Sequence, residues 1–327
     1  MIGITTTIPL EIPLAAGKKV IDLNNLFITH EDPRDLTEEA ELAGFPRNTC
    51  NWIKGIYSII KRLGITEVIA VTEGDCSNTK ALMEVLTTEG IRSIPFAYPF
   101  SRSRKELAAQ LELFSQAFGV PPAPVLKIKE RLDKIRAKVG EIDRLTWQEG
   151  RVGSLENHLF LINTSDMKGD PEAFEKETDA FLEEARHRPP ARPELRLAFV
   201  GVPPIFTDLY PLVESLGGHV VFNETQRQFA MPGLRPSLVD QYLAYTYPYG
   251  IFARLEDIQG QLARRRVDGV LHYVQSFCFR QIEDIVLKKE LNLPVLTLEG
   301  DQPGPLDART RIRLESFMEM LKAAKKR

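Results

Sequence analysis

Short runs of apolar residues alternate along the chain with longer segments whose apolar residues recur at helical spacing. The runs at 19–23 (KVIDL), 67–71 (EVIAV) and 91–99 (IRSIPFAYP) predict strands. The first of them is expected to open the fold and to continue towards residues 26–27. Between the first two runs, NWIKGIYSIIKRLG predicts a helix that stops near Gly64. Strands that alternate with helices indicate parallel sheets covered by helices on both faces.

A long helical stretch and a proline-rich segment divide the chain. Residues 103–185 are predicted to be mostly helical, and 187–194 (HRPPARPE), with three prolines and flanking charges, predicts a linker. The alternation of strands and helices resumes directly after it. We therefore expect two doubly wound α/β domains, 1–190 with a helical extension and 191–327.

Two segments, one from each predicted domain, follow the same plan. ITEVIAVTEGDC (65–76) and VDGVLHYVQSFC (267–278) each form a strand, a short polar turn and a cysteine, followed by a helix and another strand. Ligands of open parallel sheets bind outside the carboxyl ends of strands. The pattern thus predicts one cysteine, Cys76 or Cys278, at that edge of each domain.

The composition disfavours several classes of protein. Forty-two Lys and Arg balance 45 Asp and Glu, a formal charge of −3, so there is no basic excess for nucleic acid. No stretch approaches the ~20 apolar residues of a membrane span, and the start does not resemble a signal peptide. We expect a cytoplasmic protein that, lacking a Walker A motif and a Gly-rich dinucleotide fingerprint, neither hydrolyses ATP nor binds NAD itself.

The chain has three cysteines, Cys50, Cys76 and Cys278. Such a sparse, odd set makes no disulfide framework, and by number alone it suggests buried small apolar residues. However, all three are predicted at the beginning of helices, with Asn48 and Thr49 as capping residues before the first. Helix N-termini lower the pKa of thiols, so the positions predict one shared thiolate site.

Three thiolates leave one position open on a metal ion or on a four-iron cluster. A zinc ion with a free water position is one interpretation, which predicts a hydrolase. The chain has no Cys-x-x-Cys pair and no His/Cys cluster, and its cysteines come from distant segments. This spacing favours a 4Fe–4S cluster seated between the domains, with one iron free to react.

At this point the sequence resembles the 2-hydroxyacyl-CoA dehydratases, a family that includes relatives of benzoyl-CoA reductase and of the double-cubane cluster proteins. The resemblance covers nearly the whole chain. Its motifs are FPRNTC (45–50), TEGDCSN (72–78), VDGVLHYVQSFC (267–278) and LPVLTLEGD (293–301), the last followed by RIRLESFMEML (311–321).

The resemblance implies two Rossmann-like domains and one 4Fe–4S cluster per chain, held by Cys50, Cys76 and Cys278. A double cubane would require two chains that meet across a dimer interface. In the dehydratases the open iron binds the thioester carbonyl of an acyl-CoA, and a separate ATP-hydrolysing iron–sulfur activator injects one electron. The resulting ketyl radical expels the 2-hydroxyl group; in the reductase relatives, electrons are consumed. The chain is thus expected to be an oxygen-sensitive lyase or low-potential reductase subunit, in a homodimer or paired with a paralogue.

Polar residues beside the cysteines complete the predicted site. Hydrogen bonds to sulfur or substrate are expected from the residues that flank the cysteines, with ordinary turn and cap chemistry as the alternative. These residues are Glu73, Asp75, Ser77 and Asn78 beside Cys76, and Gln275 and Ser276 beside Cys278. Gln275 and Glu299 are the candidate catalytic residues. The alternative function is a cluster-bearing accessory or electron-transfer protein of the same fold, without catalysis.

Overall fold

The computed structural model describes residues 1–326 and contains two four-stranded sheets, in each of which all neighbouring strands are parallel. The first sheet, of order β2-β1-β3-β4, contains β1 (Ile2–Ile4), β2 (Val20–Asp22), β3 (Glu67–Glu73) and β4 (Arg92–Ala97). The second, of order β6-β5-β7-β8, contains β5 (Leu195–Gly201), β6 (Gly218–Asn223), β7 (Gly269–Gln275) and β8 (Val295–Gly300). The predicted α/β class with two doubly wound units is confirmed.

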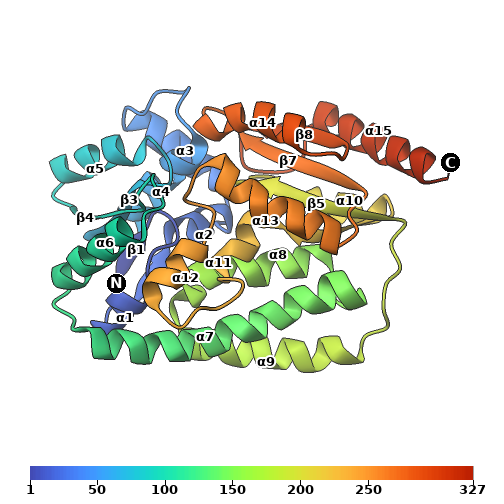
Figure 1. Cartoon of the computed structure of the whole chain (residues 1–327). Helices are drawn as coiled ribbons and strands as arrows, with labels where there is room; N and C mark the ends of the chain where they lie inside the picture. The colour runs from blue at the N-terminus through green and yellow to red at the C-terminus, as the bar shows by residue number, and fades with distance from the viewer. Residues whose placement is uncertain (327) are drawn as a thin grey trace.

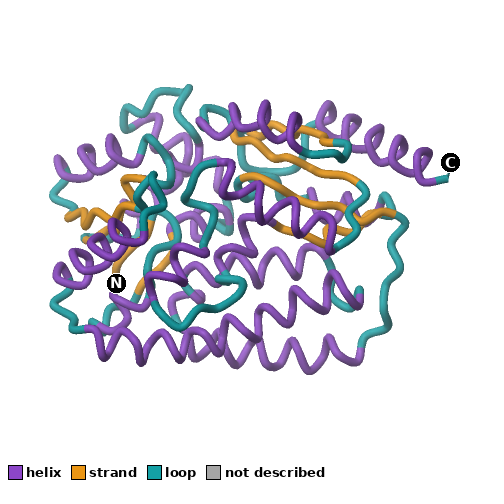
Figure 2. The backbone as a smooth tube through the Cα atoms, viewed as in Figure 1, coloured by secondary structure: helices purple, strands orange, loops and turns teal. Residues whose placement is uncertain are grey.

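Helices cover both sheets and connect them (Figure 1; Figure 2). Those around the first sheet are α1 (Glu11–Ala15), α2 (Leu23–Ile28), α3 (Pro33–Leu42), α4 (Asn51–Arg62) and α5 (Thr79–Thr88). The middle of the chain forms α6 (Arg104–Ala117), α7 (Pro122–Arg144), α8 (Ser154–Ile162) and α9 (Pro171–His187), with short helical turns η1 (Leu145–Glu149), η2 (Asn163–Ser165) and η3 (Met167–Gly169). Around the second sheet lie α10 (Leu209–Ser215), α11 (Glu224–Phe229), α12 (Leu238–Ala244), α13 (Ile251–Arg264), η4 (Phe279–Ile282), α14 (Glu283–Glu290) and α15 (Ala308–Lys325).

Helix α4 illustrates why the predicted elements form where they do. Its apolar face buries Ile53, Ile56 and Ile60 at the spacing of one helical stripe. Lys61 and Arg62 occupy the last turn, where positive charge is favourable. Gly64 follows with a φ of 60°, the left-handed conformation that ends many helices.

The sequence pattern fails at the first strand. The run at 19–23 is predicted to open the fold, but β1 (Ile2–Ile4) precedes it and pairs with both β2 and β3. Three residues are too few to show the alternation typical of a strand. Because β1 lies between β2 and β3, hydrogen bonds on both sides stabilise it. The predicted continuation of β2 towards residues 26–27 is also wrong, because the Asp22 carboxylate accepts the N–H of Asn24 at 2.9 Å and begins α2.

The two sheets share one apolar interior. Leu23 and Ile60 of the first part belong to the same buried cluster as Phe199 and Leu271 of the second. Helix α12 also returns to pack on α6, far from it in sequence. A boundary near residue 190 divides the chain between the two sheets, although the side chains of the two parts pack together. The division into two domains stays a prediction. No helix among residues 1–326 is long and apolar enough to span a membrane.

Candidate functional site

The three cysteines, although distant in sequence, line one cavity of about 90 Å³, which we call the cysteine cavity. Its walls are built from the carboxyl ends of strands in both sheets: Thr5 follows β1, Asp22 ends β2, Val202 follows β5 and Gln275 ends β7. The other residues that line it are Thr6, Asn24, Asn25, Trp52, Ile53, Ile56, Asp75, Ile162, Pro203, Phe229, Tyr247, Phe279 and Arg280. The three cysteines therefore lie around one cavity, at the edge where the topology of parallel sheets places ligands, and their role as a shared site stays a prediction.

Cys50 is the N-cap residue of α4, rather than following the cap as the sequence suggested. Its side chain is buried, with the residue 5% exposed. Burial raises the pKa of the Cys50 thiol to about 12, although the backbone N–H groups of Trp52 and Ile53 act in the opposite direction. The charge of Cys278 raises this pKa further.

Cys76 and Cys278 occupy equivalent turns after β3 and β7. Cys278 is the N-cap of η4, and Cys76 lies two residues before Asn78, the N-cap of α5. Burial raises the pKa of both thiols, while the backbone N–H of Asn78 faces Cys76 and that of Arg280 faces Cys278. Each cysteine in the molecule thus interacts with the N–H of the second residue after it.

The turn before Cys76 is held tightly from the other half of the molecule. Gly74 has a φ of 92°, and a Cβ there would lie 2.8 Å from the Cβ of Pro248 and 2.9 Å from that of Tyr98. Only glycine fits this approach without displacing its neighbours. The position of Cys76 is consequently fixed by contact with the segment before α13.

The expectation of lowered thiol pKa values is wrong for these cysteines. Burial is the largest cause in all three cases, and it outweighs the N–H groups at the helix starts. Thiolates in such a cavity require a positively charged partner, which iron ions would provide. The donor set therefore fits a metal-bound state: three thiols around one cavity, with an N–H directed at each.

The geometry bears on the kind of metal group. Among residues 1–326, no three or more His, Cys, Asp or Glu side chains are arranged to hold a single ion. A cluster binds its cysteines through different iron atoms, so its thiolates surround the group rather than converge on one point. Trp52 adds a further detail, because its indole N–H on the cavity wall is buried and has no hydrogen-bond partner in the described part of the chain.

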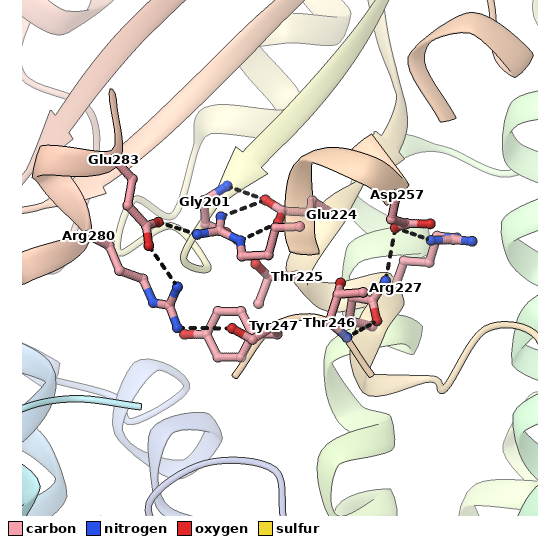
Figure 3. A network of polar contacts seen from close by, with 11 residues as sticks. Gly201, Glu224, Thr225, Arg227, Thr246, Tyr247, Asp257, Arg280 and Glu283 are labelled. Atoms are coloured by element: carbon pink, nitrogen blue, oxygen red, sulfur yellow. Dashed lines mark hydrogen bonds and ion pairs between the residues drawn. The ribbon is translucent and has the colours of Figure 1, made fainter. Parts of the chain in front are cut away.

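Arg280 is the one basic residue lining the cavity within the described chain. Its guanidinium donates to the carbonyl of Tyr247 at 2.9 Å and lies 4.6 Å from the centre of that ring. A second bond, of 3.3 Å, reaches the carboxylate of Glu283 (Figure 3). These contacts hold a positive charge beside Cys278 and Asp75, and its interaction lowers the pKa of both groups against the effect of burial.

A buried chain of charges supports Arg280 from behind. Glu283 also pairs with Arg254, which is fully buried. Arg254 pairs in turn with Glu224 through bonds of 2.7 and 3.0 Å, and Glu224 accepts the N–H of Gly201 at 2.9 Å (Figure 3). The network connects the end of β5 to the loop that carries Cys278, so it fixes Arg280 relative to the second sheet.

Two carboxyl groups face the same cavity without an ion-pair partner in the described residues. Asp75, partly buried, has a pKa raised to about 6, first by burial and less by the charge of Asp22. Burial also raises the pKa of Asp22. Sequence reasoning pointed to Asp75 beside Cys76, but it missed Asp22 and Arg280 as site residues, although a strand end and a position near a cysteine were usable signals.

The structure separates the two candidate catalytic residues. Gln275 lines the cysteine cavity, where its amide donates to the Asp301 carbonyl and accepts from Tyr273, at 2.9 and 2.7 Å. Glu299 is exposed and lies in a neighbouring hollow, where it accepts from Ser276 at 3.2 Å. Neither catalytic role is tested by these positions, and both stay predictions.

In the described part of the chain, no side-chain hydrogen bond connects Ser77, Asn78 or Ser276 to a cysteine. Ser77 is exposed, and the side chain of Asn78 makes no capping bond. Ser276 donates its backbone N–H to Gly300 at 2.8 Å, which links the ends of β7 and β8. Their predicted bonds to sulfur or substrate also stay predictions.

The family model described as 2-hydroxyglutaryl-CoA dehydratase, D-component, matches residues 5–321, which include all three cysteines and both sheets. Among curated proteins, none matches the chain.

Proposed function

Because the chain belongs to the 2-hydroxyglutaryl-CoA dehydratase D-component family, we propose that it is the cluster-bearing component of a dehydratase that acts on a 2-hydroxyacyl-CoA. Cys50, Cys76 and Cys278 would hold one 4Fe–4S cluster with one iron open to substrate. The observation that carries the proposal is the meeting of three thiols, from three distant segments, around a single cavity.

The chain's own groups would prepare this site for a negatively charged cluster. When bound, the cluster would supply an electron and a Lewis-acidic iron. The N–H groups of Trp52, Asn78 and Arg280 face the three sulfur atoms and stabilise the thiolate form. The guanidinium of Arg280 adds a fixed positive charge, and the apolar wall of Ile53, Ile56 and other side chains limits access of water.

The proposal includes a second protein. A D-component implies further components, and we propose that a separate ATP-hydrolysing iron–sulfur activator supplies the electron. The chain would work as a homodimer or together with a paralogue.

Anaerobic reconstitution with iron and sulfide tests the cluster. We expect about four irons per chain and a brown protein. Replacement of an exposed serine that does not line the cavity, Ser316→Ala, serves as a control and should leave the iron content unchanged. A colourless chain with no bound iron after reconstitution would reject the proposal.

The size of the cavity favours one second candidate. Its free space of about 90 Å³ is far below the roughly 300–1,000 Å³ of a typical small-molecule site. A non-catalytic electron-transfer protein of the same fold would need no substrate pocket. Reconstituted chain that exchanges electrons with an activator, but neither binds nor converts 2-hydroxyglutaryl-CoA, would support this candidate over the dehydratase.

A further inference from the structure

A second hollow, of about 470 Å³, adjoins the cysteine cavity. Asp22 and Asn25 line both spaces, so they form the partition between them. The side chains of Lys168 and Glu177 line the second space and are exposed. The outer hollow, as we call it, therefore extends from solvent to the wall of the cysteine cavity.

A pair of buried carboxyl groups occupies this partition. The backbone N–H of Asp22 donates to Oδ2 of Asp166 at 2.7 Å, and Asp166 lines the outer hollow. The two residues are 3% and 6% exposed. Asp22 thus contacts both spaces, while Asp166 contacts the outer one.

Neither carboxyl group has a cationic partner among residues 1–326. The side chain of Asp22 accepts from neutral groups, which include the backbone N–H and the amide of Asn24, both at 2.9 Å, and the hydroxyl of Ser165. Lys168 donates its backbone N–H to Asp166, while its ammonium group pairs with Glu177. Burial and then the charge of Asp22 raise the pKa of Asp166 to about 7, so the pair readily carries a proton near neutral pH.

We propose that Asp22 exchanges protons with the ligand in the cysteine cavity and that Asp166 connects Asp22 to the outer hollow. The identity of this ligand rests on the proposed function. In dehydration of a 2-hydroxyacyl-CoA, Asp22 would donate its proton to the departing hydroxyl group as the C2–O bond breaks and water forms. The proton lost from the neighbouring carbon returns to Asp22, so the step is balanced in protons and redox-neutral overall.

Other charged groups face the pair and would affect its titration. Asp75 and Arg280 lie on the side of the cysteine cavity. Glu156, Lys168 and Glu177 lie on the side of the outer hollow. These groups stay unchanged in the variants below, so differences among the variants report on the pair.

A purely structural role makes a different prediction. Asp22 caps α2, and Asp166 accepts the N–H of Lys168 at the start of η3. Asparagine caps helices about as well as aspartate, so Asp22→Asn and Asp166→Asn would then fold normally and keep the wild-type pH profile. Asp170→Asn is the matched control, since Asp170 caps α9 in the same way but lines neither space.

The first measurement uses the chain without added metal. Infrared titration should show a protonated carboxyl band that persists near neutral pH in the wild type and in Asp170→Asn. The band should weaken in Asp22→Asn and in Asp166→Asn. A wild type without this band at neutral pH, or variants that retain it in full, would overturn the proposal.

The second measurement uses reconstituted chain, activator and 2-hydroxyglutaryl-CoA as the probe. Asp22→Asn should lower turnover by about 100-fold at unchanged iron content. Asp166→Asn should shift the pH profile with a smaller loss. Normal turnover of Asp22→Asn would overturn the role of Asp22, whereas failure to bind iron would reject the proposed function alone. If the wild type does not convert this thioester, the infrared titration alone decides whether Asp22 and Asp166 share a proton near neutral pH.

Discussion

The two four-stranded halves of the molecule have the same strand order, and in each a cysteine follows the third strand. They differ at the helix that precedes this strand. In the first half that helix, α4, begins after buried Cys50; in the second it is α13, which begins after exposed Gly250. The equivalent turns thus supply one thiol from each half. The third thiol, Cys50, comes from a position at which the second half has Gly250. The odd number of thiols follows from this asymmetry.

Buried carboxyl groups near the cysteine cavity also differ between the halves in their partners. In the second, burial would raise the pKa of Glu224, but Arg254 outweighs this effect and the pKa is lowered. In the first, Asp22 and Asp166 lack such a partner and their pKa values are raised. Paired charges therefore fix a loop in the second half, whereas Asp22 and Asp166 in the first half have no ion pair among the described residues.

Loss of a thiol from either half should have the largest effect. We expect Cys76→Ser and Cys278→Ser to abolish cluster binding equally, and Cys50→Ser to do the same, because all three sulfur atoms surround one cavity. Iron content and visible absorbance after anaerobic reconstitution measure this. A variant at one turn that retains all its iron would break the equivalence of the two halves.

Removal of the buried arginine should come next. Arg254→Met would leave Glu224 and Glu283 without their shared partner and should cost about 3–5 kcal/mol of unfolding free energy. Urea denaturation measures the loss. The exposed pair of Arg104 and Asp240 provides the control, since Arg104→Met should cost less than about 1 kcal/mol. Equal costs would show that the buried network contributes no special stability.

The unpaired carboxyl groups should make stability depend on pH. Because folding raises the pKa of Asp166 from 3.8 to about 7, its ionisation opposes folding increasingly as pH rises through that interval. Asp166→Asn should reduce the loss of stability over the same interval, by up to about 1.4 kcal/mol per pH unit. Denaturation at several pH values tests this. A wild type and variant with parallel curves would contradict the raised pKa.

The smallest effect on iron binding is expected from a substitution at Gly250, the position of the second half that corresponds to Cys50. Gly250→Cys adds a thiol at the position equivalent to Cys50, but Gly250 is exposed and absent from the cavity lining. The variant should bind the same amount of iron as the wild type. An increase would show that the second half also offers a ligand position.

Sequence reasoning succeeded where a pattern was long or repeated. The repeated strand, turn and cysteine correctly placed Cys76 and Cys278 at equivalent strand ends, and the long helices of residues 103–185 were identified. It missed β1, which three residues define, and the short helices α11 and α12, which tertiary packing stabilises. It also gave the thiols lowered pKa values, because a helix start is visible in a sequence while the depth of burial is not.

The site residues that were missed share a cause. Asp22 and Arg280 have ordinary local roles in a cap and a short helix, and only the packing of the two halves directs them to one cavity. Their convergence depends on contacts between residues more than 100 positions apart, which no local pattern records.

The carbonyl of Asp301 accepts hydrogen bonds from both halves of the molecule. It accepts from Asn51 at the start of α4 and from Gln275 at the end of β7, each at 2.9 Å, so one atom connects the two halves beside the cysteines. A movement that separates α4 from the end of β7 would open the cavity and break the hydrogen bond from Asn51. Breaking one hydrogen bond costs about 0.5–1.5 kcal/mol. Collective movements of this kind take microseconds to milliseconds. Removal of this hydrogen bond, as in Asn51→Ala, would thus alter how fast a group enters or leaves the cavity.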